Sequence, residues 1–149
     1  MEVQKDFREF LALLNAHKVD FIIVGGYALA YHGAPRYTGD IDVFIKPDHA
    51  NAKRIINVLK DFGFSPLELS IEDFQKKDNV VQLGLPPVRI DIITSISGVS
   101  WEQAEVSKEL GEYGDVPVFY IGKDQYLDNK RATGRAKDIA DIEALGEEE

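Results

Sequence analysis

The sequence predicts an α/β (α+β) protein in which a mixed β-sheet is flanked by helices. Some segments repeat apolar residues at helical spacing, while other, shorter runs are rich in β-branched residues. Glycine or proline separates many of these segments. The runs over residues 80–85 and 88–94 follow each other without a helix between them. These two strands are therefore predicted to be neighbours in a mixed sheet, not parts of a long parallel βαβ array.

The first half of the chain is predicted to contain helices and strands in alternation. Residues 4–17 have helical apolar periodicity, and residues 21–24 form a short apolar run that ends at a Gly-Gly turn. A short helix is expected over 27–32, closed by the glycine that follows it. After a loop that contains proline and glycine, residues 40–45 alternate acidic and apolar side chains and predict a strand. Residues 48–62 predict an amphipathic helix that Asp48 caps.

The second half begins with the two adjacent strands over 80–85 and 88–94. Ser100 and Gln103 have the spacing of a capping box and predict the start of a short helix. A last strand is expected over 116–121. The chain from 123 to about 145 is predicted to be helical, with a break near Gly134.

The length of 149 residues suits a single domain over 1–149, in which residues 144–149 form a frayed acidic tail. The chain has no cysteine, which excludes disulfides and thiolate zinc sites. No apolar run reaches the roughly 20 residues that span a bilayer. Met1–Asp6 lacks the features of a signal peptide. A cytoplasmic protein without membrane contact is therefore expected.

The formal charge of −9 comes from 26 acidic and 17 basic residues. An extended nucleic-acid surface needs clustered lysine and arginine, so this balance argues against one. A small-molecule or protein substrate fits the charge better.

The most informative motif is Asp40-Ile41-Asp42 in the second predicted strand. Strand side chains alternate between faces, so Asp40 and Asp42 point the same way with Cα atoms about 6.6 Å apart. Two carboxylates on one face repel each other and raise one pKa unless a cation lies between them. Mg²⁺ suits such a pair when phosphate oxygens complete its octahedron. The alternative interpretation is the solvated face of an edge strand.

Arg89-Ile90-Asp91-Ile92 has the same alternation as the first acidic strand. If the two strands are neighbours, Asp91 joins Asp40 and Asp42. Three carboxylates around two metal ions suit in-line phosphoryl transfer, because ions about 3.5–4 Å apart stabilise the attacking and leaving oxygens. Asp91 is also the candidate for accepting the proton of the incoming hydroxyl.

Gly25 and Gly26 follow a buried strand and precede a helix, the setting in which backbone N–H groups hold phosphate. Glycine allows the backbone to approach an anion closely. In the loop before the acidic strand, Arg36 can pair with a phosphate, and Thr38 can fix the loop or touch the nucleotide. The alternatives are a plain turn at the glycines, a surface arginine and a turn threonine.

The order of strand, Gly-Gly, short helix, loop and Asp-Ile-Asp resembles the signature of the polymerase-beta-like nucleotidyltransferase superfamily. It is most similar to small stand-alone bacterial and archaeal members, the minimal nucleotidyltransferase and abortive-infection groups. The residues that carry this likeness are Val24–Leu29, His32, Gly33, Arg36, Thr38 and Asp40–Asp42.

This resemblance implies the nucleotidyltransferase fold and transfer of a nucleoside monophosphate from a nucleoside triphosphate such as ATP to a hydroxyl. It implies that Gly25 and Gly26 contact the triphosphate. It also implies that Asp40 and Asp42 bind Mg²⁺, with Asp91 as the third carboxylate of a two-ion site.

Lys130 and the later stretch Arg135-x-Lys137-Asp138-x-x-Asp141 are similar to the segment that closes the chain in the same group. The resemblance implies that Lys130 neutralises the triphosphate and that Asp138 orients Lys130 or Arg135. The alternative is a surface helix with ion pairs at i,i+3 and i,i+4 spacing.

The acceptor hydroxyl is not identified by the sequence, and a small molecule, a protein and an RNA end all remain open. Two other functions also remain open. One is an antitoxin-like regulatory partner that binds or modifies a toxin-type protein. The other is a protein that binds nucleotide without turnover.

Overall fold

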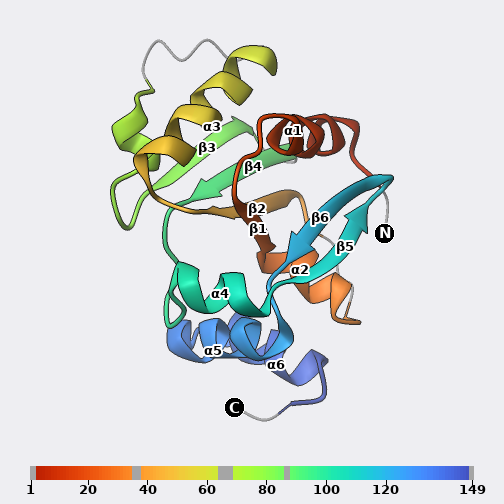
Figure 1. Ribbon diagram of the computed structural model, residues 1–149. Helices are drawn as coiled ribbons and strands as arrows, with labels where there is room; N and C mark the ends of the chain where they lie inside the picture. Colours follow the sequence, from red (N-terminus) through yellow and green to blue (C-terminus); the bar gives the residue numbers. More distant parts are fainter. Residues whose placement is uncertain (1–2, 35–37, 64–68, 86–87, 148–149) are drawn as a thin grey trace.

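The computed structural model describes residues 3–34, 38–63, 69–85 and 88–147 (Figure 1). Within these ranges a sheet separates two groups of helices, with α1 and α3 on one side and α4, α5 and α6 on the other. The elements in chain order are α1 (Lys5–Ala16), β1 (Phe21–Val24), α2 (Gly25–Tyr31), β2 (Asp40–Ile45), α3 (His49–Asp61), the 3₁₀ turn η1 (Ile71–Phe74), β3 (Val80–Leu85), β4 (Val88–Ile93), α4 (Trp101–Ser107), β5 (Glu109–Tyr113), β6 (Val116–Tyr120), α5 (Lys123–Thr133) and α6 (Ala136–Ala144).

The sheet has six strands in the order β3-β4-β2-β1-β6-β5. Strand β2 runs parallel to β4, and β1 runs parallel to β6, while the other neighbours are antiparallel. The sheet is therefore mixed, as predicted. Strand β2 lies between β4 and β1, so the interpretation of its acidic motif as part of an edge strand is wrong.

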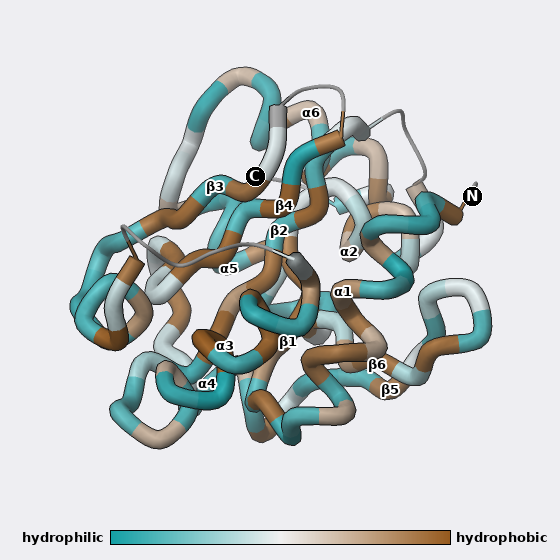
Figure 2. Tube along the Cα trace, turned by 90° about the horizontal axis from the view of Figure 1, so that it is seen from above, coloured by the Kyte–Doolittle hydropathy of each residue, from teal (hydrophilic) through white to brown (hydrophobic). Residues whose placement is uncertain are grey.

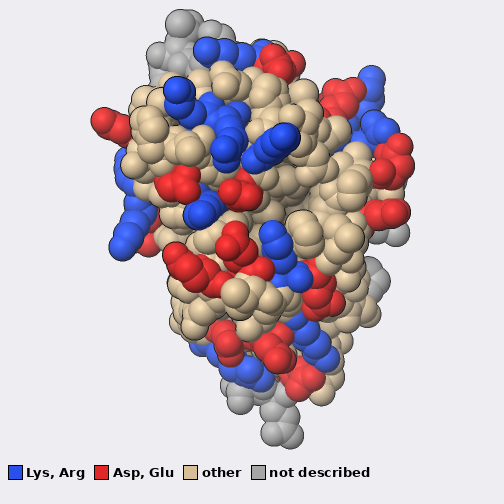
Figure 3. Space-filling view, in the orientation of Figure 1, with Lys and Arg blue, Asp and Glu red and all other residues tan. Residues whose placement is uncertain are grey.

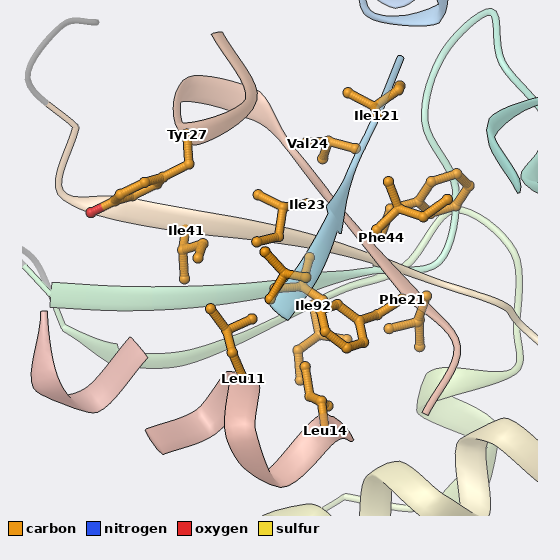
Figure 4. Packing of buried hydrophobic residues seen from close by; sticks show 14 of the residues in the cluster. Leu11, Leu14, Phe21, Ile23, Val24, Tyr27, Ile41, Phe44, Ile92 and Ile121 are labelled. Carbon is orange, nitrogen blue, oxygen red and sulfur yellow. The ribbon is translucent and has the colours of Figure 1, made fainter. Parts of the chain in front are cut away.

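Alternation along the central strands gives the sheet two different faces. Ile41, Val43 and Ile45 of β2 are fully buried on the face that α1 covers. Figure 4 shows Leu11 and Leu14 of α1 directed toward this face. In Figure 2 the hydrophobic segments concentrate in the central strands, and many of the hydrophilic ones lie in the surrounding loops. The opposite face of β2 carries Asp40 and Asp42, followed by Phe44, which packs against Trp101 of α4.

Helix ends follow the local signals of the sequence. The Asp48 carboxylate accepts a hydrogen bond from the N–H of Asn51 at the start of α3. Ser100 and Gln103 form both hydrogen bonds of the predicted capping box at the start of α4. Gly134, at φ 62°, ends α5 in the left-handed conformation, which confirms the predicted break in the C-terminal helical segment.

Strand β5 is an element that the sequence analysis did not predict. Its sequence Glu-Leu-Gly-Glu-Tyr has little apolar character, and Leu110 is 65% exposed. The strand forms because it pairs with β6 at the edge of the sheet. Helix α2 also begins earlier than expected, at Gly25, because the chain turns into the helix directly after β1.

No helix in the described part of the chain combines the length and the apolar character that crossing a bilayer requires.

We expect Ile92→Ala to lower the free energy of unfolding by about 2–5 kcal/mol, because Ile92 is 1% exposed in the core and its truncation leaves a cavity. Leu110→Ala on β5 serves as the comparison and should change that free energy by less than about 0.5 kcal/mol. Urea denaturation of both variants measures the difference. Equal losses would contradict this placement of the core.

Candidate active site

Three carboxylates predicted from the sequence lie on one face of two neighbouring strands. In the parallel pairing of β2 with β4, Asp42 stands opposite Asp91, and Asp40 stands opposite Arg89. Residues in register on adjacent strands share a face, so all four side chains project from the side of the sheet that α1 does not cover. Asp91 is only 7% exposed. The sheet therefore holds two carboxylates side by side, with a third two residues away along β2.

The environment of Asp42 opposes its ionisation. Burial, the negative charges of Asp91 and Asp40, and a hydrogen bond with the Asp91 carboxyl together raise the pKa of Asp42 to about 6. The positive charge of Lys130 acts in the opposite direction. A cation placed between the carboxylates would remove this repulsion.

The Gly-Gly turn lies directly against this carboxylate cluster. Gly25 has a φ of 69°, and a Cβ atom at this position would overlap the Asp42 carboxylate. A Cβ at Gly26 would lie 3.0 Å from the Thr38 hydroxyl oxygen. Both glycines are therefore needed for close approach, the first to Asp42 and the second to the loop that precedes β2.

Thr38 fixes that loop, because its hydroxyl donates a hydrogen bond to the carbonyl oxygen of Asp40 at 3.0 Å. This contact matches one of the two roles considered for Thr38. Arg36, the other loop residue proposed from the sequence, lies outside the described residues. His32 follows α2, and its Nε2 lies 2.7 Å from the carbonyl oxygen of Ile121, which ties the end of α2 to the end of β6.

Arg89 belongs to the cluster, although the sequence analysis assigned it no role. Its Nε donates to Asp91 Oδ1 at 2.8 Å, and one terminal nitrogen donates to Asp40 Oδ2 at 2.8 Å and to Asp91 Oδ2 at 3.0 Å. The hydrogen bond to Asp91 raises the pKa of the Arg89 guanidinium. The Arg-x-Asp spacing contained the signal, since residues two apart on a strand share a face.

Lys130 on α5 lies close enough to the cluster for its charge to act on Asp42. It is 7% exposed, and its Nζ lies 3.3 Å from Asp138 Oδ1 and 3.6 Å from Asp141 Oδ2 on α6. Its charge acts on the Asp42 carboxylate. Burial of Lys130, Asp138 and Asp141 does not fit a plain surface helix, although the i,i+3 ion pair between Arg135 and Asp138 that this alternative included is present.

Asp138 is the centre of this second network. Its carboxylate accepts hydrogen bonds from Lys130, from the Thr133 hydroxyl at 2.6 Å and from Arg135 Nε at 2.7 Å. Burial alone would raise the pKa of Asp138, but the hydrogen bonds from Arg135 and Thr133 and the charge of Lys130 hold it well below its ordinary value. Asp138 thus contacts Lys130 and Arg135, the two basic residues between which the resemblance left its orienting role open.

The donor chemistry of the carboxylate cluster fits a hard divalent cation. Asp40, Asp42 and Asp91 supply oxygen ligands of the kind that Mg²⁺ prefers, and burial together with the charges of Asp91 and Asp40 raises the pKa of Asp42. Among the described residues, however, no three acidic or histidine side chains are already arranged around a metal position. The Arg89 guanidinium provides the positive charge at Asp40 and Asp91.

Comparison with known proteins agrees with this geometry. A family model described as the nucleotidyl transferase AbiEii toxin of type IV toxin–antitoxin systems matches residues 10–112, which include the Gly-Gly turn and all three carboxylates. No protein with a curated description matches the chain.

Several solved structures share the fold. A proposed nucleotidyltransferase from Thermotoga maritima has a TM-score of 0.62 at 15% identity, over 92% of this chain and 88% of that one. The lincosamide antibiotic adenylyltransferase LnuA, in its lincomycin-bound form, has a TM-score of 0.57 at 16% identity over 98% of both chains. The antibiotic-resistance factor ANT(2'')-Ia has a TM-score of 0.60 at 14% identity, over 94% of this chain and 80% of that one. The predicted nucleotidyltransferase fold is confirmed.

Asp42→Asn is expected to stabilise the protein at pH 8 in the presence of a metal chelator. The native pKa of Asp42, about 6, lies above its ordinary value of 3.8, so the native state binds more protons between these values. The stability linked to that proton is present below pH 4 and is lost as the pH rises through 6. The uncharged amide avoids this loss and should add about 2 kcal/mol at pH 8.

Urea denaturation of wild type and Asp42→Asn between pH 4 and pH 8 measures this effect. The two stabilities should converge toward pH 4. A variant that is less stable than wild type at pH 8 would contradict the described environment of Asp42.

Asp138→Asn should lower the free energy of unfolding at pH 7 by about 3 kcal/mol, because the buried Lys130 loses a charged partner. Since the native pKa of Asp138 is depressed, its contribution is present above the ordinary carboxyl pKa and is lost as the pH falls. Asp115→Asn is the matched control, in which an exposed ion pair with Arg8 is broken, and its effect should be much smaller. Similar losses in both variants, measured by urea denaturation, would argue against a buried network at Asp138.

Proposed function

Because the chain belongs to the AbiEii nucleotidyl transferase family, we propose that it transfers a nucleoside monophosphate from a nucleoside triphosphate to an acceptor hydroxyl with the help of Mg²⁺. The observation that carries this proposal is the register of β2 and β4, which sets Asp42 against Asp91 beside Gly25. This arrangement combines anionic oxygens for a divalent cation with a backbone turn that can approach a phosphate.

In this proposal Asp40, Asp42 and Asp91 hold the metal, and a two-ion site fits three carboxylates. A bound divalent cation would offset the charge of the phosphate oxygens during transfer. Asp91 is the proposed acceptor of the proton from the incoming hydroxyl. Both of its oxygens accept hydrogen bonds from Arg89. Each oxygen keeps a second lone pair that can take the proton.

The triphosphate is proposed to lie along the Gly-Gly turn, with Lys130 on its other side. The backbone at Gly25 lies directly beside the Asp42 carboxylate, so a phosphate bound at the turn would also lie close to the proposed metal ligands. Lys130 is held by Asp138 and Asp141, so its ammonium is fixed before the nucleotide binds. Thr38 is proposed to support the loop through the Asp40 carbonyl, and Arg36 to pair with phosphate.

The acceptor is proposed to be a small molecule or a protein. The formal charge is −9. On the face shown in Figure 3, lysine and arginine side chains are interspersed with aspartate and glutamate. Such a surface suits a compact acceptor better than an extended nucleic acid.

The family description names a toxin, and we therefore propose a toxin-like modifying role for this chain, with an antitoxin as its protein partner. The same description gives no support to the antitoxin-like role left open by the sequence. We also propose that residues 1–149 form one nucleotidyltransferase domain, since α5 and α6 contribute Lys130 and its partners to the site on the sheet.

The test is transfer of label from α-³²P nucleoside triphosphates, each with Mg²⁺, to candidate proteins, RNA ends and small-molecule hydroxyl compounds. Wild type should label an acceptor, and Asp42→Asn should reduce the rate by about 100-fold or more, because it removes a charged metal ligand. Asp115→Asn makes the same chemical change at an exposed ion pair with Arg8 and should keep wild-type activity. Equal labelling by Asp42→Asn and wild type would refute the proposed site.

A further inference from the structure

The carboxylate cluster already contains a cation that belongs to the protein. Arg89 bridges two of the three proposed metal ligands, with contacts of 2.8 Å to Asp40 and 2.8 Å to Asp91. The side chain of Arg89 is 23% exposed, that of Asp40 35% and that of Asp91 10%. This is a partly buried fork geometry in which a planar guanidinium binds carboxylates more firmly than a lysine would.

Lys130, the other cation near the cluster, is paired with acidic residues of α6. Lys130 acts on Asp42 through its charge, but its ammonium is 3.3 Å from Asp138 and 3.6 Å from Asp141. Among the described residues, in contrast, the side-chain hydrogen bonds of Arg89 all end on Asp40 and Asp91. Arg89 therefore occupies oxygens of two of the three proposed metal ligands.

The strand next to Arg89 has no side chain at the position opposite it. In the antiparallel pairing of β3 with β4, the residue opposite Arg89 is Gly84, which has no side chain. A Cβ at Gly84 would lie 2.9 Å from the carbonyl oxygen of Val88, so the backbone itself favours glycine there. The strand beside Arg89 thus places no side chain at that register position.

We infer that Arg89 is a built-in counter-ion that competes with divalent cations for Asp40 and Asp91 and is displaced when the cation enters with the nucleotide. The inference rests on the proposed function, because it assumes that these carboxylates hold the metal. Arg89 is a positioning residue here, acting through the two carboxylates.

The competition follows from charge. A divalent cation that arrives alone must replace the guanidinium on the same oxygens and is repelled by its positive charge. A triphosphate brings negative oxygens that offset both cations and can accept hydrogen bonds from a released arginine. Free metal should therefore bind weakly, and metal accompanied by nucleotide should bind well.

This role predicts an effect opposite to that of a purely structural arginine. If Arg89 only held the site in shape, its removal would weaken metal binding or leave it unchanged. If Arg89 competes with the metal, its removal leaves three carboxylates without their cation, and metal binding becomes tighter. The direction of the change in affinity distinguishes the two roles.

The experiment measures Mn²⁺ binding by electron paramagnetic resonance in the absence of nucleotide, for wild type, Arg89→Gln, Arg89→Lys and Asp42→Asn. Mn²⁺ is the probe because it accepts the oxygen ligands that Mg²⁺ uses. Arg89→Gln should bind Mn²⁺ about tenfold or more tighter than wild type. Arg89→Lys should fall between the two, since lysine keeps the charge but not the fork.

Arg8→Gln is the matched control. Arg8 makes a similar two-bond pair with Asp115, at 2.7 and 2.8 Å, outside the site. Its loss should leave Mn²⁺ affinity at the wild-type value. Thermal melting provides a second measurement of the same competition, because added Mn²⁺ should raise the melting temperature of Arg89→Gln more than that of wild type. If Arg89→Gln does not fold, Arg89→Lys carries the test through its expected gain in affinity.

Unchanged or weaker Mn²⁺ binding in folded Arg89 variants would overturn the inference, while leaving the proposed site intact if Asp42→Asn still abolishes binding. Mn²⁺ binding that is the same in Asp42→Asn and wild type would overturn the metal site itself and the inference with it. Tighter binding in Arg89→Gln, lost again in the double variant with Asp42→Asn, would support both.

Discussion

Repulsion between carboxylates on one face of the sheet is the constraint on which the rest of the site depends. The parallel register of β2 and β4 places Asp42 beside Asp91 and leaves Asp40 next to Arg89. The apolar residues on the opposite face of the same strands pack against α1, so the register cannot slip without moving the core residues to the solvent side. Hydrophobic packing therefore holds together groups that would separate on electrostatic grounds alone.

Three features are linked to this repulsion: two nearby cations that offset it, and a raised pKa. Arg89 neutralises Asp40 and Asp91 directly, Lys130 acts on Asp42 from α5, and part of the remaining cost appears as the raised pKa of Asp42. Arg89 and Lys130 differ in the partners that hold them. Lys130 is fixed by the acids of α6, whereas Arg89 contacts only the cluster itself in the described hydrogen bonds. Lys130 thus has partners of its own outside the carboxylate cluster. Arg89 is bound to Asp40 and Asp91, which are themselves proposed metal ligands.

Repulsion among the carboxylates lowers the stability of the folded protein and at the same time favours the binding of a cation. In the proposed function, the repulsion among the carboxylates is relieved when a cation binds, and this relief contributes to binding. The buried network around Asp138 shows the contrasting case, in which the hydrogen-bond donors around the carboxylate stabilise its charged form. The two clusters have similar residue types, and their different environments give their carboxyls opposite pKa shifts.

The sequence by itself determined the types of most elements, the helix ends at Asp48, Ser100 and Gly134, and the placement of Asp40 and Asp42 on one face of a strand. These features depend on local periodicity, on turn residues and on the alternation of side chains along a strand, all of which can be inferred from neighbours in the chain. The family resemblance carried by Val24–Leu29 and Asp40–Asp42 was also confirmed.

Tertiary structure alone decided which strands are neighbours and what surrounds each charge. The pairing of β2 with β4 brings residues 49 positions apart into contact, so the bond between Arg89 and Asp40 has no local signal. Strand β5 exists only because β6 offers it an edge, and Lys130 is buried only because α6 folds back over α5. Long-range contacts of this kind depend on how the apolar faces pack together, and a single sequence does not specify that packing residue by residue.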